Sequence, residues 1–263
     1  DLHSFPTRRS SDLNAAGRGV GRHLALRLAE HGWEVIGTGR RAPEDRDLGP
    51  IRYVQADLVR EETADALVAL LAETAPELIV HNAVRYGPPP GSVPALSELD
   101  EVFRVNATLP YHVLLRHLTS LPPDVGCSCV VVNSDAIYHA NASTGVYAAS
   151  KAALRVLTTA LAAACRSRNA SVSTLVLGPL ADDRKLGELR QIADRRGTSE
   201  AEVTKAYLRR GNPSYVTDSL IDLESCFRSV EYLAGLGKAA NGMVCRLDGG
   251  SVQIGRASCR ERV

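Results

Sequence analysis

Short apolar runs alternate with amphipathic stretches along most of the chain. Runs typical of strands lie at residues 33–38, 52–56, 77–81, 129–133, 172–177 and 243–247. Two of these runs, Leu78-Ile79-Val80 and Val130-Val131-Val132, are apolar at consecutive positions. That pattern is typical of strands covered on both faces, as in a parallel sheet.

Helical periodicity fills the spaces between these runs. One apolar stripe with i, i+3, i+4 and i+7 spacing is formed by Ala64, Leu67, Val68 and Leu71. Residues 145–168 are rich in Ala and Leu and contain no Pro and no interior Gly. Another stripe is formed by Phe227, Val230, Leu233 and Ala234. Strand–helix alternation over about 240 residues predicts an α/β fold, a doubly wound parallel sheet of the Rossmann-like kind.

Residues 179–220 interrupt this alternation. They contain no strand-like run but a polar pair of helical segments, and Ser199-Glu200-Ala201-Glu202 has the form of a capping box. An insertion near the carboxyl end of a strand is where an open α/β sheet would carry a substrate lid. A solvated helical decoration is an equally good interpretation of the segment.

The two ends of the chain differ in character from the rest. Residues 1–13 resemble the translation of a sequencing-library adapter, and residues 254–263 resemble the translation of its complementary strand. We therefore expect a native domain at residues 14–252, with non-native segments at 1–13 and 253–263. On this hypothesis the first strand of the sheet is missing or replaced.

Composition places the chain among ordinary globular proteins. Of 263 residues, 44% are hydrophobic and 23% are charged, which excludes a disordered chain, a collagen and a coiled coil. A net charge of +1 gives no reason to expect nucleic acid or an anionic membrane as a partner. No apolar run reaches the ~18–20 residues of a membrane span.

The cysteines indicate a reducing compartment. The domain contains Cys127, Cys129, Cys165, Cys226 and Cys245, and no secretory signal pattern. We therefore expect a cytoplasmic protein. Cys127 and Cys129 form the one close pair, and because no second Cys or His pair follows, we expect core cysteines and no metal.

A glycine-rich turn opens the domain. Residues 14–21 carry glycines at 17, 19 and 21 and lead into a helix that runs to about residue 31. Such a turn lets backbone N–H groups approach a pyrophosphate at the helix N-terminus. The candidate cofactor-binding residues here are Gly17, Arg18, Gly19, Val20 and Gly21.

Two arginines follow the next strand. A dinucleotide fold that binds NAD places an acidic residue at this point, whereas this chain has Arg40 and Arg41. A guanidinium matches a 2′-phosphate, so the sequence favours NADP(H) over NAD(H). Arg18 lies within reach of the same phosphate. The alternative is that some of these arginines are solvated surface charges.

Tyr147 and Lys151 are spaced to share one helix face. A free phenol has a pKa near ~10, and a neighbouring ammonium lowers it. Such a pair can protonate a carbonyl oxygen while hydride arrives at the carbon. Ser134 ends the 129–133 run, and Asn106 lies in a predicted helix.

With these four residues in view, residues 14–252 resemble the short-chain dehydrogenase/reductase family. The resemblance implies that Tyr147 is the proton donor or acceptor and that Lys151 lowers its pKa and binds the nicotinamide ribose. It also implies that Ser134 hydrogen-bonds the substrate oxygen and that Asn106 holds a water linked to Lys151.

Further segments are similar to motifs of this family. Ala56-Asp57-Leu58 resembles its adenine-contacting segment, His81-Asn82-Ala83-Val84 its Asn-Asn-Ala-Gly motif, and Leu247-Asp248-Gly249-Gly250 its final turn. Departures are Ala15 for a glycine, His81 for an asparagine, Val84 for a glycine, and Gly178-Pro179 for Pro-Gly. The implied further cofactor contacts are Asp57, Leu58, Asn82, Ala83, Tyr147, Lys151, Gly178 and Pro179.

Asp135 beside Ser134 is unusual for such a site. It can touch substrate or simply cap the strand end, and we favour the cap. Tyr138 and His139 can shape a pocket, although we expect packing roles first.

The combined interpretation is an NADPH-dependent oxidoreductase that reduces a ketone or aldehyde, such as a 3-oxoacyl thioester. We expect a small carbonyl or alcohol substrate and a homodimer or homotetramer. Alternatives are an NAD-dependent alcohol dehydrogenase of the same fold, a non-catalytic dinucleotide-binding or sensing protein, and a chain that lost activity with its first strand.

Overall fold

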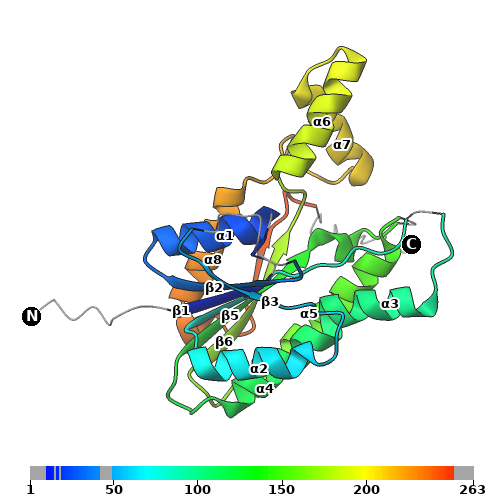
Figure 1. Cartoon of the computed structure of the whole chain (residues 1–263). Coiled ribbons are helices and arrows are strands. Elements are labelled where there is room, and N and C mark those ends of the chain that lie inside the picture. Colours follow the sequence, from blue (N-terminus) through cyan, green and yellow to red (C-terminus); the bar gives the residue numbers. More distant parts are fainter. Residues whose placement is uncertain are drawn as a thin grey trace, which may run out of the picture.

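A parallel sheet of seven strands forms the centre of the computed structural model, which describes residues 10–14, 16–17, 19–41, 49–89, 91–141 and 143–251 (Figure 1). The strands are β1 (Ser10–Asn14), β2 (Glu34–Gly39), β3 (Arg52–Gln55), β4 (Leu78–His81), β5 (Cys127–Ser134), β6 (Ala170–Leu177) and β7 (Val244–Leu247). Their order across the sheet is β3-β2-β1-β4-β5-β6-β7, with every neighbouring pair parallel. The predicted doubly wound, Rossmann-like α/β fold is confirmed.

Helices connect the strands. The α-helices are α1 (Gly19–Glu30), α2 (Thr63–Thr74), α3 (Leu96–Phe103), α4 (Leu109–Ser120), α5 (Gly145–Ala164), α6 (Asp183–Arg196), α7 (Glu200–Gly211) and α8 (Leu223–Gly235). Shorter helical turns are the π-helical η1 (Arg104–Thr108) and the 3₁₀ turns η2 (Asp135–Tyr138) and η3 (Gly237–Ala240).

The helices cover both faces of the sheet, and each face has its own apolar core. Leu24 and Leu28 of α1 and Phe227 of α8 pack on one face. Helices α2, α4 and α5 pack on the other, where Leu118 and Leu154 are fully buried. Figure 1 shows α1 and α8 on one side of the sheet and α2, α4 and α5 on the opposite side.

Burial of the strands agrees with the sequence pattern. Every residue of β4 and β6 is buried, as is all of β5 except Ser134. The predicted strands agree with the observed ones within two residues at each end. In α2 the most deeply buried face is Thr63, Leu67, Leu70 and Leu71, and the predicted stripe members Ala64 and Val68 are only partly buried.

The first strand was predicted to be missing or replaced, and the structure shows that it is not missing. Residues 10–14 form β1 between β2 and β4, in register with Glu34–Thr38 on one side and Leu78–Val80 on the other. Pairing within a sheet uses backbone N–H and C=O groups, which any non-proline residue supplies. A polar segment therefore forms the strand, and part of the segment expected to be non-native lies within the sheet.

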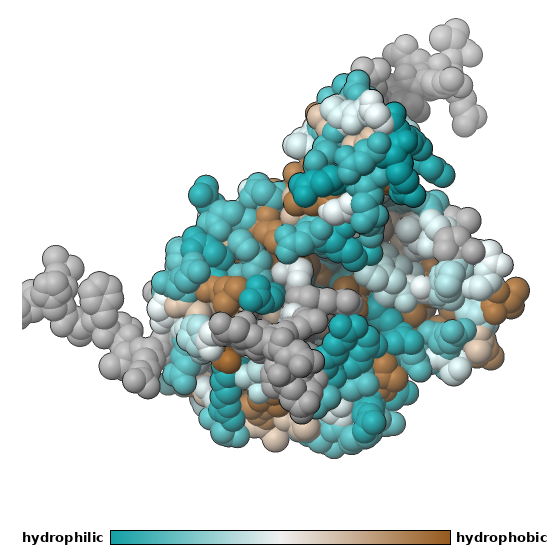
Figure 2. Space-filling view, turned by 45° about the horizontal axis from the view of Figure 1, so that its top comes forward, coloured by the Kyte–Doolittle hydropathy of each residue, from teal (hydrophilic) through white to brown (hydrophobic). Residues whose placement is uncertain are grey.

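Residues 179–220 contain the two predicted helices, α6 and α7, which pack on each other through Leu189, Ala193 and Val203. The Asp182 carboxylate accepts from the Lys185 N–H at 2.8 Å to begin α6, and the Ser199–Glu202 capping box begins α7 as predicted. This α6–α7 hairpin projects from the sheet (Figure 1), and its visible surface is mainly hydrophilic (Figure 2).

Candidate functional site

The residues singled out in the sequence lie along the carboxyl ends of the parallel strands. Arg40 follows β2, Asp57 follows β3, Asn82 follows β4, Ser134 ends β5 and Gly178 follows β6. Open parallel sheets bind ligands at this edge because the chain reverses there and the strand ends face one crevice.

The glycine turn lies between β1 and α1. Gly19 has φ +55°, a left-handed conformation that favours glycine, and α1 begins at this exposed residue. Val20 and Gly17 are half-buried and Gly21 is buried within α1. Ala15 and Arg18 lie outside the described residues. The first turn of α1 therefore offers backbone N–H groups, which no intrahelical acceptor satisfies, to an anion.

Arg40 and Arg41 are exposed beyond β2. Side chains of β3 hold their backbone: Gln55 Nε2 donates to the Arg40 carbonyl at 3.0 Å, and the Tyr53 hydroxyl donates to the Arg41 carbonyl at 2.9 Å. Neither guanidinium forms an ion pair with any residue in the described ranges.

A hollow of about 400 Å³ lies beside Arg40, between the ends of β2 and β3 and the start of α2. Asp57, Arg60 and Glu62 also line it. The Asp57 carboxylate accepts from the Val59 N–H at 3.2 Å, which fixes the turn after β3. Sequence inspection missed Arg60, because a single arginine after a strand carries no distinguishing pattern.

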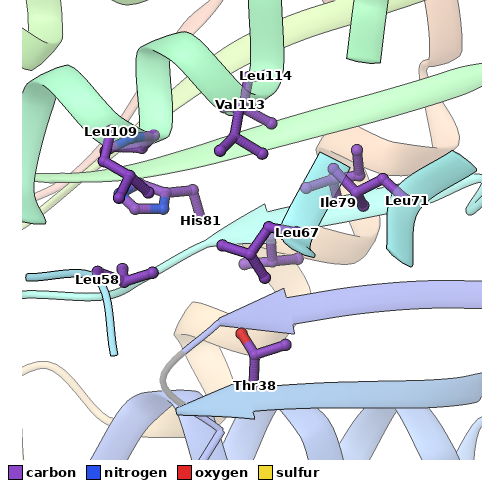
Figure 3. A pocket seen from close by; sticks show the side chains of 11 residues that line it. Thr38, Leu58, Leu67, Leu71, Ile79, His81, Leu109, Val113 and Leu114 are labelled. Atoms are coloured by element: carbon purple, nitrogen blue, oxygen red, sulfur yellow. The ribbon is translucent and has the colours of Figure 1, made fainter. Parts of the chain in front are cut away.

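Leu58 does not line the hollow beside Arg40. It is buried and lines a small inner cavity of about 30 Å³, with Thr38 and His81 among otherwise mostly apolar side chains (Figure 3). Burial and the nearby Lys151 charge lower the pKa of His81 to about 3, so its imidazole is neutral at physiological pH. Asn82 and Ala83, directly after β4, are buried at the strand edge.

Asn106 lies in η1, a π-helical turn between α3 and α4, whereas the sequence predicted an ordinary helix. Its amide nitrogen donates to the Arg85 carbonyl and to Ser150 Oγ, both at 2.8 Å, and its oxygen accepts from the Arg85 N–H at 2.8 Å. The side chain is fully buried. Such π-turns occur frequently at functional sites, and this one brings Asn106 against α5.

Lys151 lies on α5 with only 2% of its surface exposed. Its Nζ donates to the Val132 carbonyl of β5 at 3.0 Å, and Asn133 Nδ2 donates to the Lys151 carbonyl at 3.0 Å. Burial lowers the pKa of Lys151 to about 8. A lysine whose pKa lies near neutrality can both give and take a proton under physiological conditions.

Tyr147 of α5 and Ser134 of β5 lie near each other, and the Ser134 hydroxyl acts to lower the pKa of Tyr147. The sequence predicted that Lys151 would lower the pKa of Tyr147, yet the structure gives the opposite direction. Burial, followed by Tyr86, raises the pKa of Tyr147 well above its ordinary value, and the Asp135 charge acts in the same direction. The Ser134 hydroxyl acts against this rise, but its effect is the smaller one.

Gly178 and Pro179 join the sheet to the hairpin. The Gly178 N–H donates to the Leu247 carbonyl at 3.0 Å, and a Cβ at Gly178 would lie 3.0 Å from the Asp248 backbone. The Pro179 carbonyl accepts from the Ile221 N–H at 2.9 Å, which closes the base of the insertion. The close approach of two backbones explains a glycine here.

Sequence inspection missed Tyr86 and Tyr215 and favoured only a capping role for Asp135. Asp135 is 5% exposed and contacts the buried Tyr215, which lies eighty residues later. Tyr86, after β4, lies with its ring centroid 5.1 Å from that of Tyr147. No local pattern connects such distant positions; only the fold does.

The cysteines pack as expected. Cys127, Cys129, Cys165 and Cys226 are buried, and burial raises the pKa of each thiol. Across the part of the chain that the structure describes, no group of three or more His, Cys, Asp or Glu is arranged to hold a metal ion. No helix within that part is both long and apolar enough to cross a bilayer.

Comparisons with known proteins agree with this geometry. The family model for short chain dehydrogenase matches residues 13–187. A short-chain type dehydrogenase/reductase from Picea abies is 26% identical and covers 91% of each chain. A short chain dehydrogenase family protein from Francisella tularensis superposes with TM-score 0.76 at 18% identity, covering 93% of this chain and 99% of that one. An actinorhodin polyketide ketoreductase solved with NADPH superposes with TM-score 0.73 at 19% identity, covering 92% and 97%. The chain belongs to the short-chain dehydrogenase/reductase family, whose members are oxidoreductases that generally depend on NAD(P).

Proposed function

We propose that this protein reduces a ketone or aldehyde with NADPH. The observation that supports the proposal is that Lys151 is buried on α5 with its Nζ donating to the Val132 carbonyl of β5, while Asn106 is buried against the same helix through its bond to Ser150 Oγ. The proposed substrate is a small carbonyl compound, with a 3-oxoacyl thioester as one candidate.

Each residue has a defined part in the proposed reaction. The reduced nicotinamide, when bound, supplies the hydride that reaches the carbonyl carbon. The Tyr147 hydroxyl gives its proton to the carbonyl oxygen, so that the product is an alcohol and Tyr147 is left as the phenolate. The Ser134 hydroxyl donates a hydrogen bond to the same oxygen, which stabilises the charge developing there.

The direction of the Tyr147 pKa shift supports reduction. A phenol whose pKa lies above its ordinary value is protonated throughout the physiological range, which is the form that a proton donor needs. Lys151, with its pKa near 8, can give or take a proton at this end of α5, and it would also contact the cofactor's ribose. Asn106 holds this end of α5 against η1 through Ser150.

The proposed cofactor is NADP(H). Arg40 and Arg41 would bind the 2′-phosphate, joined by Arg18 from the glycine turn. Gly17, Gly19, Val20 and Gly21 would offer N–H groups to the pyrophosphate. Further contacts are proposed for Asp57, Leu58, Asn82, Ala83, Tyr147, Lys151, Gly178 and Pro179. A solved neighbour holds NADPH, which supports the choice without deciding it.

We also propose the wider setting of this activity. The protein would act in the cytoplasm as a homodimer or homotetramer, with residues 14–252 as one domain and the α6–α7 hairpin as a substrate lid. Residues 1–13 and 253–263 are proposed to be non-native, with residues 10–13 nevertheless completing the sheet of this domain as part of β1.

The test is NADPH consumption with a panel of ketones and aldehydes, comparing wild type with Tyr147→Phe. Loss of the proton donor is expected to lower kcat by roughly 10²–10⁴-fold while leaving NADPH affinity within about twofold. The matched control is Tyr232→Phe, which alters an exposed tyrosine on α8. Wild-type turnover by Tyr147→Phe would refute the assigned role, and no turnover of any carbonyl by wild type would refute the function.

A further inference from the structure

Tyr86 holds an exposed aromatic ring against Tyr147. It lies in the segment that follows β4, its ring centroid is 5.1 Å from that of Tyr147, and the two ring planes are tilted by 42°. Even with this contact, 62% of Tyr86 is exposed. Single exposed aromatic side chains are common on protein surfaces. The way in which the chain holds this one therefore decides whether it has a task.

The backbone is fixed on both sides of Tyr86. On one side, the Asn106 side chain bonds both polar groups of the Arg85 backbone, accepting from its N–H and donating to its carbonyl, each at 2.8 Å. On the other side, Gly87 lies so close to α5 that a Cβ there would be 3.3 Å from Val146 Cβ. Tyr86 is thus held over the start of α5 by η1 and by α5 itself.

A ring that is fixed and still exposed is well suited to bind a flat ligand. Ordering a side chain costs conformational entropy, and a ligand that meets a side chain already in place does not have to offset that cost. Aromatic rings pack favourably on one another in offset or edge-to-face arrangements. The exposed surface of Tyr86 can therefore receive a planar apolar group whose neighbouring atoms reach Tyr147.

Other exposed apolar side chains follow the same two strands. Val84, at a position where the similar family motif has glycine, follows β4 and is 37% exposed. Tyr138 ends η2, four residues after Ser134, and is 45% exposed. The Arg246 guanidinium lies 5.4 Å from the centroid of the Tyr138 ring. Ligands of open parallel sheets bind at these strand ends, so exposed apolar surface is available where a substrate would lie.

From this geometry we propose that Tyr86 is a specificity-determining residue whose exposed ring receives the aromatic group of the substrate, so that aryl ketones and aryl aldehydes are the preferred substrates. In such a compound the carbonyl is attached to the ring, just as Tyr147 lies beside Tyr86. The inference rests on the proposed function, which it deepens by naming the substrate class. It favours aryl carbonyl compounds over the 3-oxoacyl thioester.

The test compares acetophenone with cyclohexyl methyl ketone, which has the same carbon skeleton but no planar ring. NADPH consumption gives kcat/KM for both ketones in wild type, Tyr86→Ala and Tyr86→Phe. The acetophenone-to-cyclohexyl ratio in each variant is divided by the wild-type ratio, so that the intrinsic reactivities of the two ketones cancel. This quotient is expected to fall roughly tenfold in Tyr86→Ala and to stay within about twofold in Tyr86→Phe, which keeps the ring.

A merely structural role of Tyr86 would give a different result. Disturbing Tyr147 lowers kcat/KM equally for both ketones and leaves their ratio at the wild-type value. An unchanged ratio in Tyr86→Ala, or an equal fall in Tyr86→Phe, would overturn the proposal. The matched control is Tyr232→Ala, which removes an exposed ring on α8 and keeps the wild-type ratio. Because Tyr86 is mostly exposed, Tyr86→Ala is expected to remain folded, as circular dichroism can show.

A binding measurement separates this proposal from the proposed function. Equilibrium dialysis of 2-acetylnaphthalene is carried out with excess NADP⁺, which cannot reduce a ketone, so the readout does not depend on turnover. The dissociation constant is expected to rise roughly tenfold in Tyr86→Ala and to stay within about twofold of wild type in Tyr86→Phe. If wild type reduces no carbonyl compound, the proposed function fails, yet the dialysis still decides the role of Tyr86. Equal binding by wild type and Tyr86→Ala, or no binding by wild type, would overturn the proposal.

Discussion

The two halves of the strand edge are built differently. On the β4–β6 side, Asn106 and Lys151 are buried and each is held by hydrogen bonds from or to the backbone of another element. On the β1–β3 side, Arg40 and Arg41 are exposed, and within the described residues the hydrogen bonds to them reach their backbone carbonyls and not their guanidiniums. The side chains of the first half are held in place without a ligand, whereas the guanidiniums of the second half lie exposed to solvent.

This difference follows from the chemistry each half is proposed to perform. A proton donor must be positioned to a fraction of an ångström and shielded from water, so its supporting groups are buried. A phosphate-binding arginine needs no such shield, because its charge is favourable in water until the anion binds. The buried half consequently carries the cost of desolvation, and mutations there act on stability even without ligand.

The largest expected effect on stability concerns Lys151. Its pKa is about 8 in the folded protein, whereas a lysine in the unfolded chain has its ordinary pKa of 10.5. Between these values the unfolded chain binds more protons, so wild-type stability rises with pH through this window. The free energy of unfolding of wild type is expected to rise by up to about 3 kcal/mol across this window. In Lys151→Met this rise is expected to disappear.

Urea unfolding between pH 7 and 10.5 measures this difference. The matched control is Lys238→Met, which removes an exposed lysine whose Nζ donates to the Cys165 carbonyl at 3.0 Å and keeps Lys151. An equal rise in Lys151→Met and wild type would show that the lysine titrates normally and is not buried as described.

Asn106→Ala is expected to lower the free energy of unfolding by about 2 kcal/mol. The substitution leaves the Arg85 N–H and carbonyl without their buried partner. Thermal unfolding without ligand is the measurement. Asn169→Ala removes a comparable but exposed hydrogen bond and is expected to cost less. Equal losses in the two variants would contradict a preorganised β4–β6 half.

Ser199→Ala is expected to have the smallest effect, about 1 kcal/mol, confined to the α6–α7 hairpin. Ser199 Oγ accepts from the Glu202 N–H at 3.2 Å and begins α7. Hydrogen exchange is expected to speed up in α7 and stay unchanged in β5 and β6. Faster exchange across the whole sheet would mean that the hairpin is not an independent unit.

The sequence predicted much of this organisation, and its failures have physical causes. The consecutive apolar runs identified β4 and β5 because both faces of these strands are covered. The same reasoning missed β1, because Ser10–Asn14 contain no consecutive apolar run, although their backbone pairs with both β2 and β4.

Within the site, sequence reasoning found the residue types but not their environment. The spacing of Tyr147 and Lys151 indicated a shared helix face, yet burial reversed the expected direction of the Tyr147 pKa shift. The contact between Asp135 and Tyr215 depends on the path of the chain through α5, β6, α6 and α7. Environments of this kind arise from the fold and have no local signature.

The most direct test of the contrast between the two halves is a titration of NADPH and NADH, followed by nicotinamide fluorescence, in wild type and in Arg40→Ala. We predict that wild type binds NADPH at least ~10-fold more tightly than NADH, about 1.4 kcal/mol, and that Arg40→Ala loses this preference while its affinity for NADH stays the same. Equal affinity of wild type for the two cofactors, or a preference that survives in Arg40→Ala, would contradict the assignment of the exposed arginines to the 2′-phosphate.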